Sequence, residues 1–411
     1  MLTFLLQALS SAKTVRAGVA ATLAQLVSQQ PGREMPSPDP SAYSQARQRL
    51  PEAVFSKVFQ DTVETVSAVA SDVATWCGRR VVLIDGSSVS MPDTPELQSA
   101  FPQPSGQKPG CGFPVARIEG LFCWKTGTCI AWEIGSLQDS EAVLFRRTLD
   151  HFQPGDVALA DRYYCSYVDI ARLMARGVDV VFRLHQTRRV DFRKGIRLGP
   201  DDQLVEWKRP TWQESFGISR EEFEQLPERM ILRMVRIKRT APGFRTKKIV
   251  VVTTILEPSE VSSDQLLDLY RDRWLVELNF RCLKTTFGME ILRGHSVDVV
   301  RKELLIHLIL YNMIRLLMWE AARQAGQAPR RLSFAGTLHR LQTVAPSLLL
   351  AHRTALDEGI FEWLISCIAR DLVPDRPNRV EPRRKKRRPK PYPLLNKPRA
   401  AYRSLSQSRS E

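Results

Sequence analysis

The sequence predicts an α/β protein built on a mixed sheet, with helices before and after it. Two short apolar runs, RRVVLID and GDVALAD, each finish on an aspartate, Asp85 and Asp161. Val-rich runs of four or five apolar residues are typical of strands that are buried on both faces. Stretches with helical spacing alternate with further strand-like runs around them. This alternation predicts one sheet with carboxylates at the exits of two strands, where functional groups collect in α/β folds.

The elements of this sheet follow in a regular order. After the Asp85 strand come two strand-like runs joined by Thr126-Gly127, which predict a hairpin over residues 115–135. The segment SEAVLFRRTLDHF is predicted to be a helix that leads to the Asp161 strand, and SYVDIARLMARG a second helix before the strand VDVVFRL. The order strand, strand, strand, helix, strand, helix, strand is the ribonuclease-H-like arrangement. It predicts that the first and fourth strands lie side by side with their aspartates adjacent.

A third acidic residue lies in a polar pattern further along the chain. Tyr270, Arg273, Glu277 and Lys284 are spaced as Y-x(2)-R-x(3)-E-x(6)-K. On a continuous helix, the four side chains fall within a wedge of roughly 60°. Cations bind phosphates and carboxylates bind hard metal ions, so this face predicts metal-assisted chemistry on a nucleic-acid backbone. The four residues by themselves fit a solvated helix face with ion pairs equally well, and the two upstream aspartates favour the site.

These motifs together resemble the DDE transposases of the insertion-sequence family often called IS-four. The matching residues are DGS at the first aspartate, LADRYYCSY around the second, and the full Y-R-E-K signature. The resemblance continues through SAYSQARQRLP, the residues FxxVFxDTV and RPNRVEPRRKKRRPK, and covers nearly the whole chain. It implies that two divalent ions, Mg²⁺ or Mn²⁺, are held by the three catalytic carboxylates Asp85, Asp161 and Glu277, with Asp85 as the bridging ligand. It also implies DNA contacts from Tyr270, Arg273 and Lys284.

The resemblance further implies a function. Such a protein would bind the terminal inverted repeats of a bacterial insertion sequence, cleave the ends by metal-dependent hydrolysis and join them to target DNA by transesterification. Its partners would be double-stranded DNA and a second copy of itself, because two ends must be held together. A cytoplasmic, nucleoid-associated location is expected.

Two other classes of protein remain open. A catalytically silent DNA-binding derivative would share the fold but would be expected to lose part of the carboxylate set, and all three acids are present. A structure-selective ribonuclease-H-like nuclease would share the acids without needing the Y-R-E-K pattern or a basic tail.

A β-rich insertion is expected between the second aspartate and the glutamate, over residues 186–255. Basic residues alternate with apolar ones through Arg233, Arg236 and Lys238, which predicts a strand with one cationic face. Ala241-Pro242-Gly243 is a predicted hairpin turn. In the resembling family, this insertion helps to hold a DNA hairpin through an aromatic side chain that stacks on a flipped base.

The stacking residue stays unassigned here. No Trp occurs between Trp212 and Trp274, which leaves Trp212 and Phe244 as candidates and the use of a hairpin intermediate open.

The charge of the chain is concentrated near its end. The net charge is +16, and the segment from Arg376 to Arg403 holds twelve Lys or Arg and one acid, Glu381. This Pro-rich tail predicts an extended electrostatic grip on phosphates, although a solubilising role is the simpler alternative. Its six consecutive cations repel one another without an anionic partner. They are the DNA-binding candidates Arg383, Arg384, Lys385, Lys386, Arg387 and Arg388.

Length and composition set the remaining limits. A chain of 411 residues with 43% apolar residues is expected to form two or three units. The apolar stretch from Lys302 is interrupted at helical spacing by His307, Asn312 and Arg315, which favours a core or dimer helix over a membrane span. The first basic residue follows the apolar N-terminal run, opposite to a secretory signal. Seven cysteines without a C-x-x-C pair disfavour a zinc site or a disulfide framework.

The predicted organisation has six parts. A helical unit of two or three helices, expected to bind DNA ends by resemblance to the family, precedes the catalytic core, which the insertion divides. A helical region and the basic tail follow. The corresponding ranges are 1–75, 76–185, 186–255, 256–300, 301–375 and 376–411.

Overall fold

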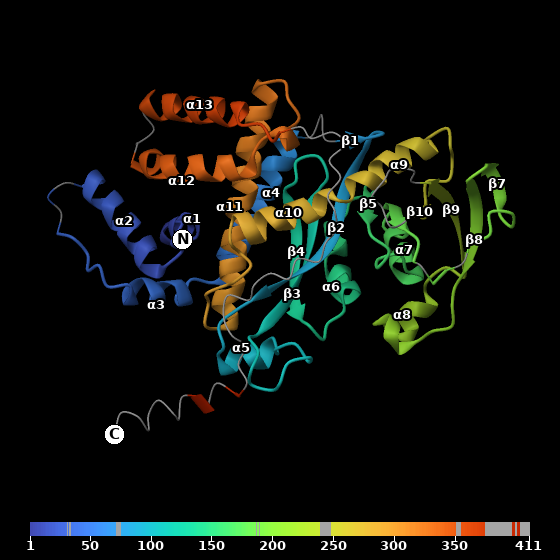
Figure 1. Ribbon diagram of the computed structural model, residues 1–411, viewed down its shortest axis with the longest axis horizontal. Helices are drawn as coiled ribbons and strands as arrows, with labels where there is room; N and C mark the ends of the chain where they lie inside the picture. Colours follow the sequence, from blue (N-terminus) through green and yellow to red (C-terminus); the bar gives the residue numbers. More distant parts are fainter. Residues whose placement is uncertain are drawn as a thin grey trace.

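Ten strands form one mixed sheet at the centre of the computed structural model (Figure 1). The structure describes residues 1–30, 32, 34–70, 75–185, 187–188, 190–238, 248–350, 355–374, 397–398 and 401–402. The strand order is β4-β3-β2-β5-β6-β10-β9-β8-β7, and the short β1 pairs with β2. The strands are β1 (Thr75–Trp76), β2 (Arg79–Ser90), β3 (Val115–Cys123), β4 (Cys129–Ser136), β5 (Val157–Ala160), β6 (Asp179–Arg183), β7 (Ile196–Gly199), β8 (Asp202–Lys208), β9 (Arg229–Lys238) and β10 (Lys248–Thr253).

The first and fourth strands of the predicted core lie side by side. β2 pairs in parallel with β5, and the last register pair is Leu83 with Leu159. The sequence predicted that this strand ends at Asp85, but β2 is longer. It continues to Ser90 because the long strand β3 stays paired with it in antiparallel register as far as Ser90 with Val115. Asp85 therefore lies within a strand, at the level where its parallel neighbour β5 stops.

Helices cover both faces of the sheet around β2. Alternate side chains of a strand point to opposite faces. Val82 and Ile84 pack in one cluster with α6 (Glu141–Arg147) and α7 (Tyr167–Met174), whereas Val81 and Leu83 pack in the main core. That core also contains residues of α4 (Glu52–Ala70), α9 (Ser263–Asp272), α10 (Leu275–Arg281) and α11 (Val297–Gln324). Ser N-caps begin several of these helices, at Ser140, Ser166, Ser262 and Ser296.

The segment predicted as an insertion extends the central sheet. β10 pairs with β6, β9 with β10, β8 with β9 and β7 with β8, all antiparallel. The predicted cationic face of β9 does not include Arg233. This side chain is fully buried, and its Nε donates to Asp202 Oδ1 at 2.9 Å. A buried charge needs such a partner. Arg233 therefore joins β9 to β8, and the side chain of Lys238 and the turn at 241–243 lie outside the described side chains and residues.

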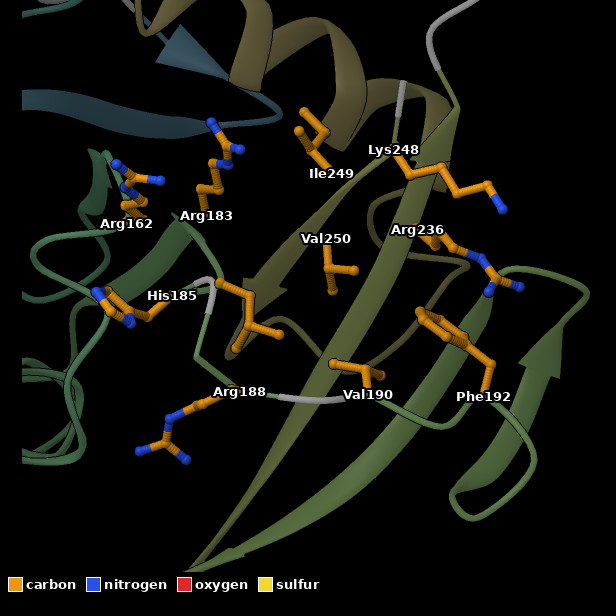
Figure 2. A pocket seen from close by; sticks show the side chains of 11 residues that line it. Arg162, Arg183, His185, Arg188, Val190, Phe192, Arg236, Lys248, Ile249 and Val250 are labelled. Atoms are coloured by element: carbon orange, nitrogen blue, oxygen red, sulfur yellow. The ribbon is translucent and has the colours of Figure 1, made fainter. Parts of the chain in front are cut away.

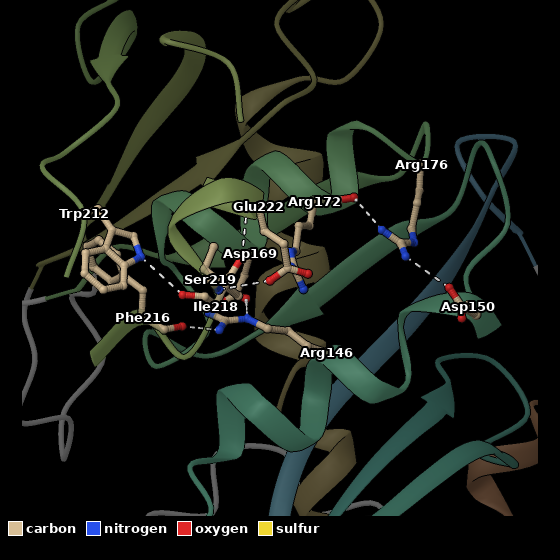
Figure 3. Close-up of polar contacts among 10 residues, drawn as sticks. All are labelled: Arg146, Asp150, Asp169, Arg172, Arg176, Trp212, Phe216, Ile218, Ser219 and Glu222. Atoms are coloured by element: carbon tan, nitrogen blue, oxygen red, sulfur yellow. Dashed lines mark hydrogen bonds and ion pairs between the residues drawn. The ribbon is translucent and has the colours of Figure 1, made fainter. Parts of the chain in front are cut away.

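The loop between β8 and β9 docks on helices α6 and α7 (Figure 3). It carries a short 3₁₀ helix, Glu214–Phe216, and α8 (Arg220–Glu224). Arg146 of α6 joins the two parts: its Nε donates to Asp169 Oδ1 of α7 at 2.6 Å, and its guanidinium also donates to the Phe216 carbonyl. The side chains of Arg146 and Asp169 are nearly inaccessible, 8% and 1% exposed. This buried pair holds the loop against the core.

A cavity of about 480 Å³ opens where the extension meets the core (Figure 2). It is lined by residues of β6, β9 and β10, by the loop that follows β6, and by Arg162, which follows β5.

The N-terminal and C-terminal helices gather at the opposite end of the molecule from β7–β10 (Figure 1). Up to residue 70 the described chain has four helices rather than the expected two or three: α1 (Leu2–Leu9), α2 (Val15–Gln29), α3 (Ser41–Arg49) and α4. After α11 come α12 (Phe334–Leu350) and α13 (Ala355–Arg370), and the short α5 (Pro95–Ala100) lies in the β2–β3 connection. In the described part of the chain, only α11 is long and apolar enough to cross a membrane, and 78% of its apolar window is buried inside the protein, as in a core helix.

Candidate active site

Asp85 and Asp161 lie at the same level on neighbouring strands. Each is two residues beyond the last parallel register pair, Leu83 with Leu159. Asp161 directly follows the end of β5, and its Oδ1 accepts a hydrogen bond from the Tyr163 backbone N–H at 2.7 Å. Asp85 Oδ1 accepts from the Gly86 N–H at 2.9 Å. Strand pairing, rather than any local contact, therefore brings the two carboxylates together.

The Y-R-E-K segment is not the continuous helix that its spacing predicted. α9 ends at Asp272 and α10 begins at Leu275. Across the junction the backbone forms i to i−3 hydrogen bonds, including Arg273 N–H to Tyr270 O at 3.2 Å and Glu277 N–H to Trp274 O at 3.1 Å. After α10 the chain widens into a π-helix, Cys282–Thr286. A tightened turn and a π-bulge within one helical segment are typical of functional sites.

Arg273 joins two of the three carboxylates in spite of this break. Its Nη2 donates to Glu277 Oε1 at 2.7 Å, and its Nη1 lies 4.0 Å from Asp85 Oδ2. The side chains of Arg273, Asp85 and Glu277 are 17%, 26% and 36% exposed. The guanidinium therefore supplies positive charge to both acids at the mouth of the site.

The other two signature residues have different surroundings. Lys284, in the π-helix, donates from Nζ to Ser87 Oγ at 3.0 Å, two residues beyond Asp85 on β2. Burial lowers the pKa of Lys284, and the charge of Glu290 opposes the shift. Tyr270 is only 9% exposed and belongs to the main core. Arg273 and Lys284 thus contact residues of β2 and Glu277 pairs with Arg273, whereas the ring of Tyr270 packs in the main core.

Asp85 is the most perturbed of the three acids. Burial raises its pKa to about 7, and the charge of Arg273 and the Gly86 N–H only partly offset this effect. Repulsion from the carboxylates of Asp161 and Glu277 raises the pKa further. Asp85 is therefore close enough to both other acids to be repelled by them, an arrangement that a cation would stabilise.

Sequence reasoning missed a fourth acid beside Asp85. Glu119 of β3 is fully buried; its Oε1 accepts from the Tyr164 hydroxyl at 2.7 Å, and its Oε2 has no hydrogen-bond partner. Burial raises the pKa of Glu119 well above its ordinary value, and the charge of Asp85 raises it further. A Cβ atom at Gly86 would lie 3.1 Å from Glu119 Oε2, so glycine lets β2 pass this side chain. The available signal was a charged residue inside the apolar run VARIEGLFC.

The donor chemistry of the site fits a hard divalent ion. Asp85, Asp161 and Glu277 offer carboxylate oxygens from β2, the end of β5 and α10, and such oxygens are the ligands of Mg²⁺ and Mn²⁺. Over the described residues, no three His, Cys, Asp or Glu side chains are grouped so as to hold a metal ion. Glu277 forms an ion pair with Arg273, and the same guanidinium lies beside Asp85.

Other sequence candidates lie elsewhere. The basic run Arg383–Arg388 and the proposed stacking residue Phe244 are outside the described residues. Trp212, the other stacking candidate, packs against a small apolar cluster with Phe223, and its indole N–H donates to Ile218 O at 3.2 Å (Figure 3). Its visible role is to pack the β8–β9 loop.

Comparison with known proteins identifies the family of the chain. The family model described as "Transposase DDE domain" matches residues 76–313, more than half of the chain. The chain belongs to this family of DDE transposases. It is thus a phosphoryl-transfer enzyme, and the matched range includes all three predicted carboxylates.

The transposase also has a curated relative. It is 26% identical over 361 residues to transposase InsG for insertion sequence element IS4 of Escherichia coli (strain K12), covering 87% of this chain and 79% of the relative. Among solved structures, a piggyBac transposase synaptic complex with hairpin DNA matches with a TM-score of 0.42 and 10% identity, over 90% of this chain and 79% of that one. The 26% identity makes the transposase a distant homologue of the IS4 enzyme.

Proposed function

We propose that this DDE transposase cleaves the ends of its own insertion sequence and joins them to target DNA at the site formed by Asp85, Asp161 and Glu277. The observation that carries the proposal is the equal level of Asp85 and Asp161 on paired parallel strands, with Glu277 linked to Asp85 through Arg273. We further propose that β2 to β6 form a ribonuclease-H-like core, because β2 and β5, the predicted first and fourth strands, lie side by side in the order β4-β3-β2-β5-β6.

The residues of the chain have separate roles in this proposal. Asp85, Asp161 and Glu277 would hold two divalent ions. When bound, such ions activate the attacking oxygen and stabilise the leaving 3′-oxygen. Arg273 reaches both Asp85 and Glu277 and is placed to meet the negative charge of a phosphate that enters between them.

Lys284 acts at a second position along the strand. Its ammonium lies on Ser87 rather than on a carboxylate, which leaves its charge for a phosphate beyond the scissile one. We propose that Tyr270 positions Arg273 and affects DNA binding indirectly, through Arg273, because the phenol is largely buried.

Assembly with DNA follows from the reaction. Joining requires two ends at once, so the active species is proposed to be a homodimer on paired double-stranded ends. The N-terminal helices α1–α4 are proposed to recognise the end sequence, and the basic tail to grip phosphates. A hairpin intermediate is compatible with the exposed ring of Trp274, 52% exposed beside Arg273, which can stack on a base.

The proposal is tested with purified transposase and duplex DNA that carries the ends flanking its gene. Asp161→Asn and Glu277→Gln keep the side-chain shape and remove the charge, so both are expected to abolish nicking in Mg²⁺ while end binding persists. Asp150→Asn, which changes an 89% exposed carboxylate, is the matched control and is expected to nick normally. Nicking at the wild-type rate by either site variant would exclude that residue. Binding without any nicking by the wild type would favour a silent DNA-binding derivative.

A further inference from the structure

The cavity beside β6 is lined by six basic side chains. Arg162, Arg183, His185, Arg188, Arg236 and Lys248 surround it, together with the apolar residues Val190, Phe192, Ile249 and Val250. Figure 2 shows Arg162, Arg183 and His185 on one side and Arg236 and Lys248 on the other, with Val250 between them. Among the described residues that line the cavity, none is acidic. It is therefore a cationic groove with an apolar floor.

Two of the arginines are fixed by the protein itself. The Arg188 guanidinium lies 3.9 Å from the centre of the Trp207 ring, and the Arg236 guanidinium lies 4.4 Å from that of Phe192. Arg236 Nε also donates to Asp201 Oδ1 at 2.6 Å. Planar guanidiniums that are held in this way lose little freedom when an anion binds. The walls of the groove are thus positioned before any ligand arrives.

Three cations of the groove lack a carboxylate partner among the described residues. Within the described part of the chain, Arg183 and Lys248 form no ion pair with a carboxylate, and neither does Arg188. Burial lowers the pKa of Arg188, which shows that its charge is held at a cost in desolvation. Closely spaced, uncompensated cations repel one another, and the natural partner is a polyanion.

Two lining residues of the groove are neighbours of the active site in the sequence and in the sheet. Arg162 directly follows Asp161, and Arg183 lies on β6, the neighbour of β5 in the sheet. A DNA backbone that extends from the three carboxylates can pass over β6 to Lys248 at the start of β10. The apolar floor suits deoxyribose, whose carbon atoms face away from the phosphates.

We infer that this groove is a sequence-independent binding track for the DNA backbone, with Arg183 and Lys248 as phosphate ligands. The inference rests on the proposed function, because it assigns the DNA that enters the carboxylate site a path across the β-extension. It adds residues that lie outside the Y-R-E-K signature. Phosphate contacts of this kind orient DNA without reading its sequence.

The test compares two double variants of equal net charge. Arg183→Gln/Lys248→Gln removes two groove cations. Arg197→Gln/Lys208→Gln removes two exposed cations from β7 and β8 of the same sheet, outside the cavity. Affinity for a fluorescein-labelled random-sequence DNA duplex is measured by anisotropy over a range of salt concentrations, and Mg²⁺-dependent nicking of the flanking-end duplex is measured in parallel. Melting temperatures verify that all proteins are folded.

The groove variant is expected to bind on the order of 30-fold more weakly near physiological salt, and to lose about 2 from the slope of log affinity against log salt. The control is expected to keep the wild-type slope. A wild-type slope for the groove variant, or equal losses in both variants, would overturn the inference while leaving the proposed function intact if the wild type still nicks. A wild type that neither binds nor nicks would overturn both.

Discussion

Replacing Asp85 with Asn is expected to stabilise the transposase, and to do so more strongly at high pH. Burial raises the pKa of Asp85 from 3.8 to about 7. Between these values the folded protein binds the proton more tightly than the unfolded chain, so the free energy of unfolding falls as pH rises, and the full penalty is present above about pH 7. At about 1.36 kcal/mol per pKa unit, the penalty is at most about 4 kcal/mol at about pH 8 and about 2 kcal/mol at about pH 5.

Thermal unfolding of the wild type and Asp85→Asn at these two pH values, without divalent ions, measures the effect. The variant should melt at a higher temperature at both values, with the larger gain at the higher pH. Asp150→Asn serves as the control and should show no such pH-dependent gain, because its side chain is 89% exposed. Excess Mg²⁺ should stabilise the wild type and leave Asp85→Asn nearly unchanged. An equal gain at both pH values, or a less stable variant at the higher one, would refute the assignment of a raised pKa to Asp85.

Three further predictions follow from the site and the charge distribution. Arg273→Ala should slow single-turnover cleavage more than it weakens end binding. It should also shift the pH profile of cleavage to higher pH, because the Arg273 charge lowers the pKa of Asp85. An unchanged rate and profile would mean that the ion pair of Arg273 with Glu277 is only structural. Lys284→Ala should impair assembly of the paired-end complex, measured on native gels, while Lys284→Arg should restore it. Wild-type assembly by the alanine variant would leave Lys284 with its hydrogen bond to Ser87 as its whole role. Deleting residues 376–411 should flatten the salt dependence of DNA binding, since thirteen Lys and Arg residues are lost; an unchanged slope would show that the tail only solubilises the chain.

The sequence alone was sufficient to identify Asp85, Asp161 and Glu277 as the candidate site acids. The two apolar runs that end near Asp85 and Asp161 could be recognised locally, and the order of elements was sufficient to predict that their strands are paired. Hydrophobic periodicity reports on contacts within one element, so it located the strands and the flanking helices. It could not show that β2 continues to Ser90, because that extension depends on pairing with β3, about thirty residues further along the chain.

Only the tertiary structure decided how the side chains meet. The junction at Arg273 and the π-helix around Lys284 break the regular helix, yet they turn both cations toward β2, and helical spacing cannot predict such a change of winding. Arg233 has the same sequence signature as Arg236, but the register of β8 and β9 places Asp202 within reach of Arg233 and buries it. The cationic groove likewise combines residues from Arg162 to Val250. Electrostatic neighbours that are distant in sequence are set by packing, and packing determines which charges are neutralised inside the protein and which remain for DNA.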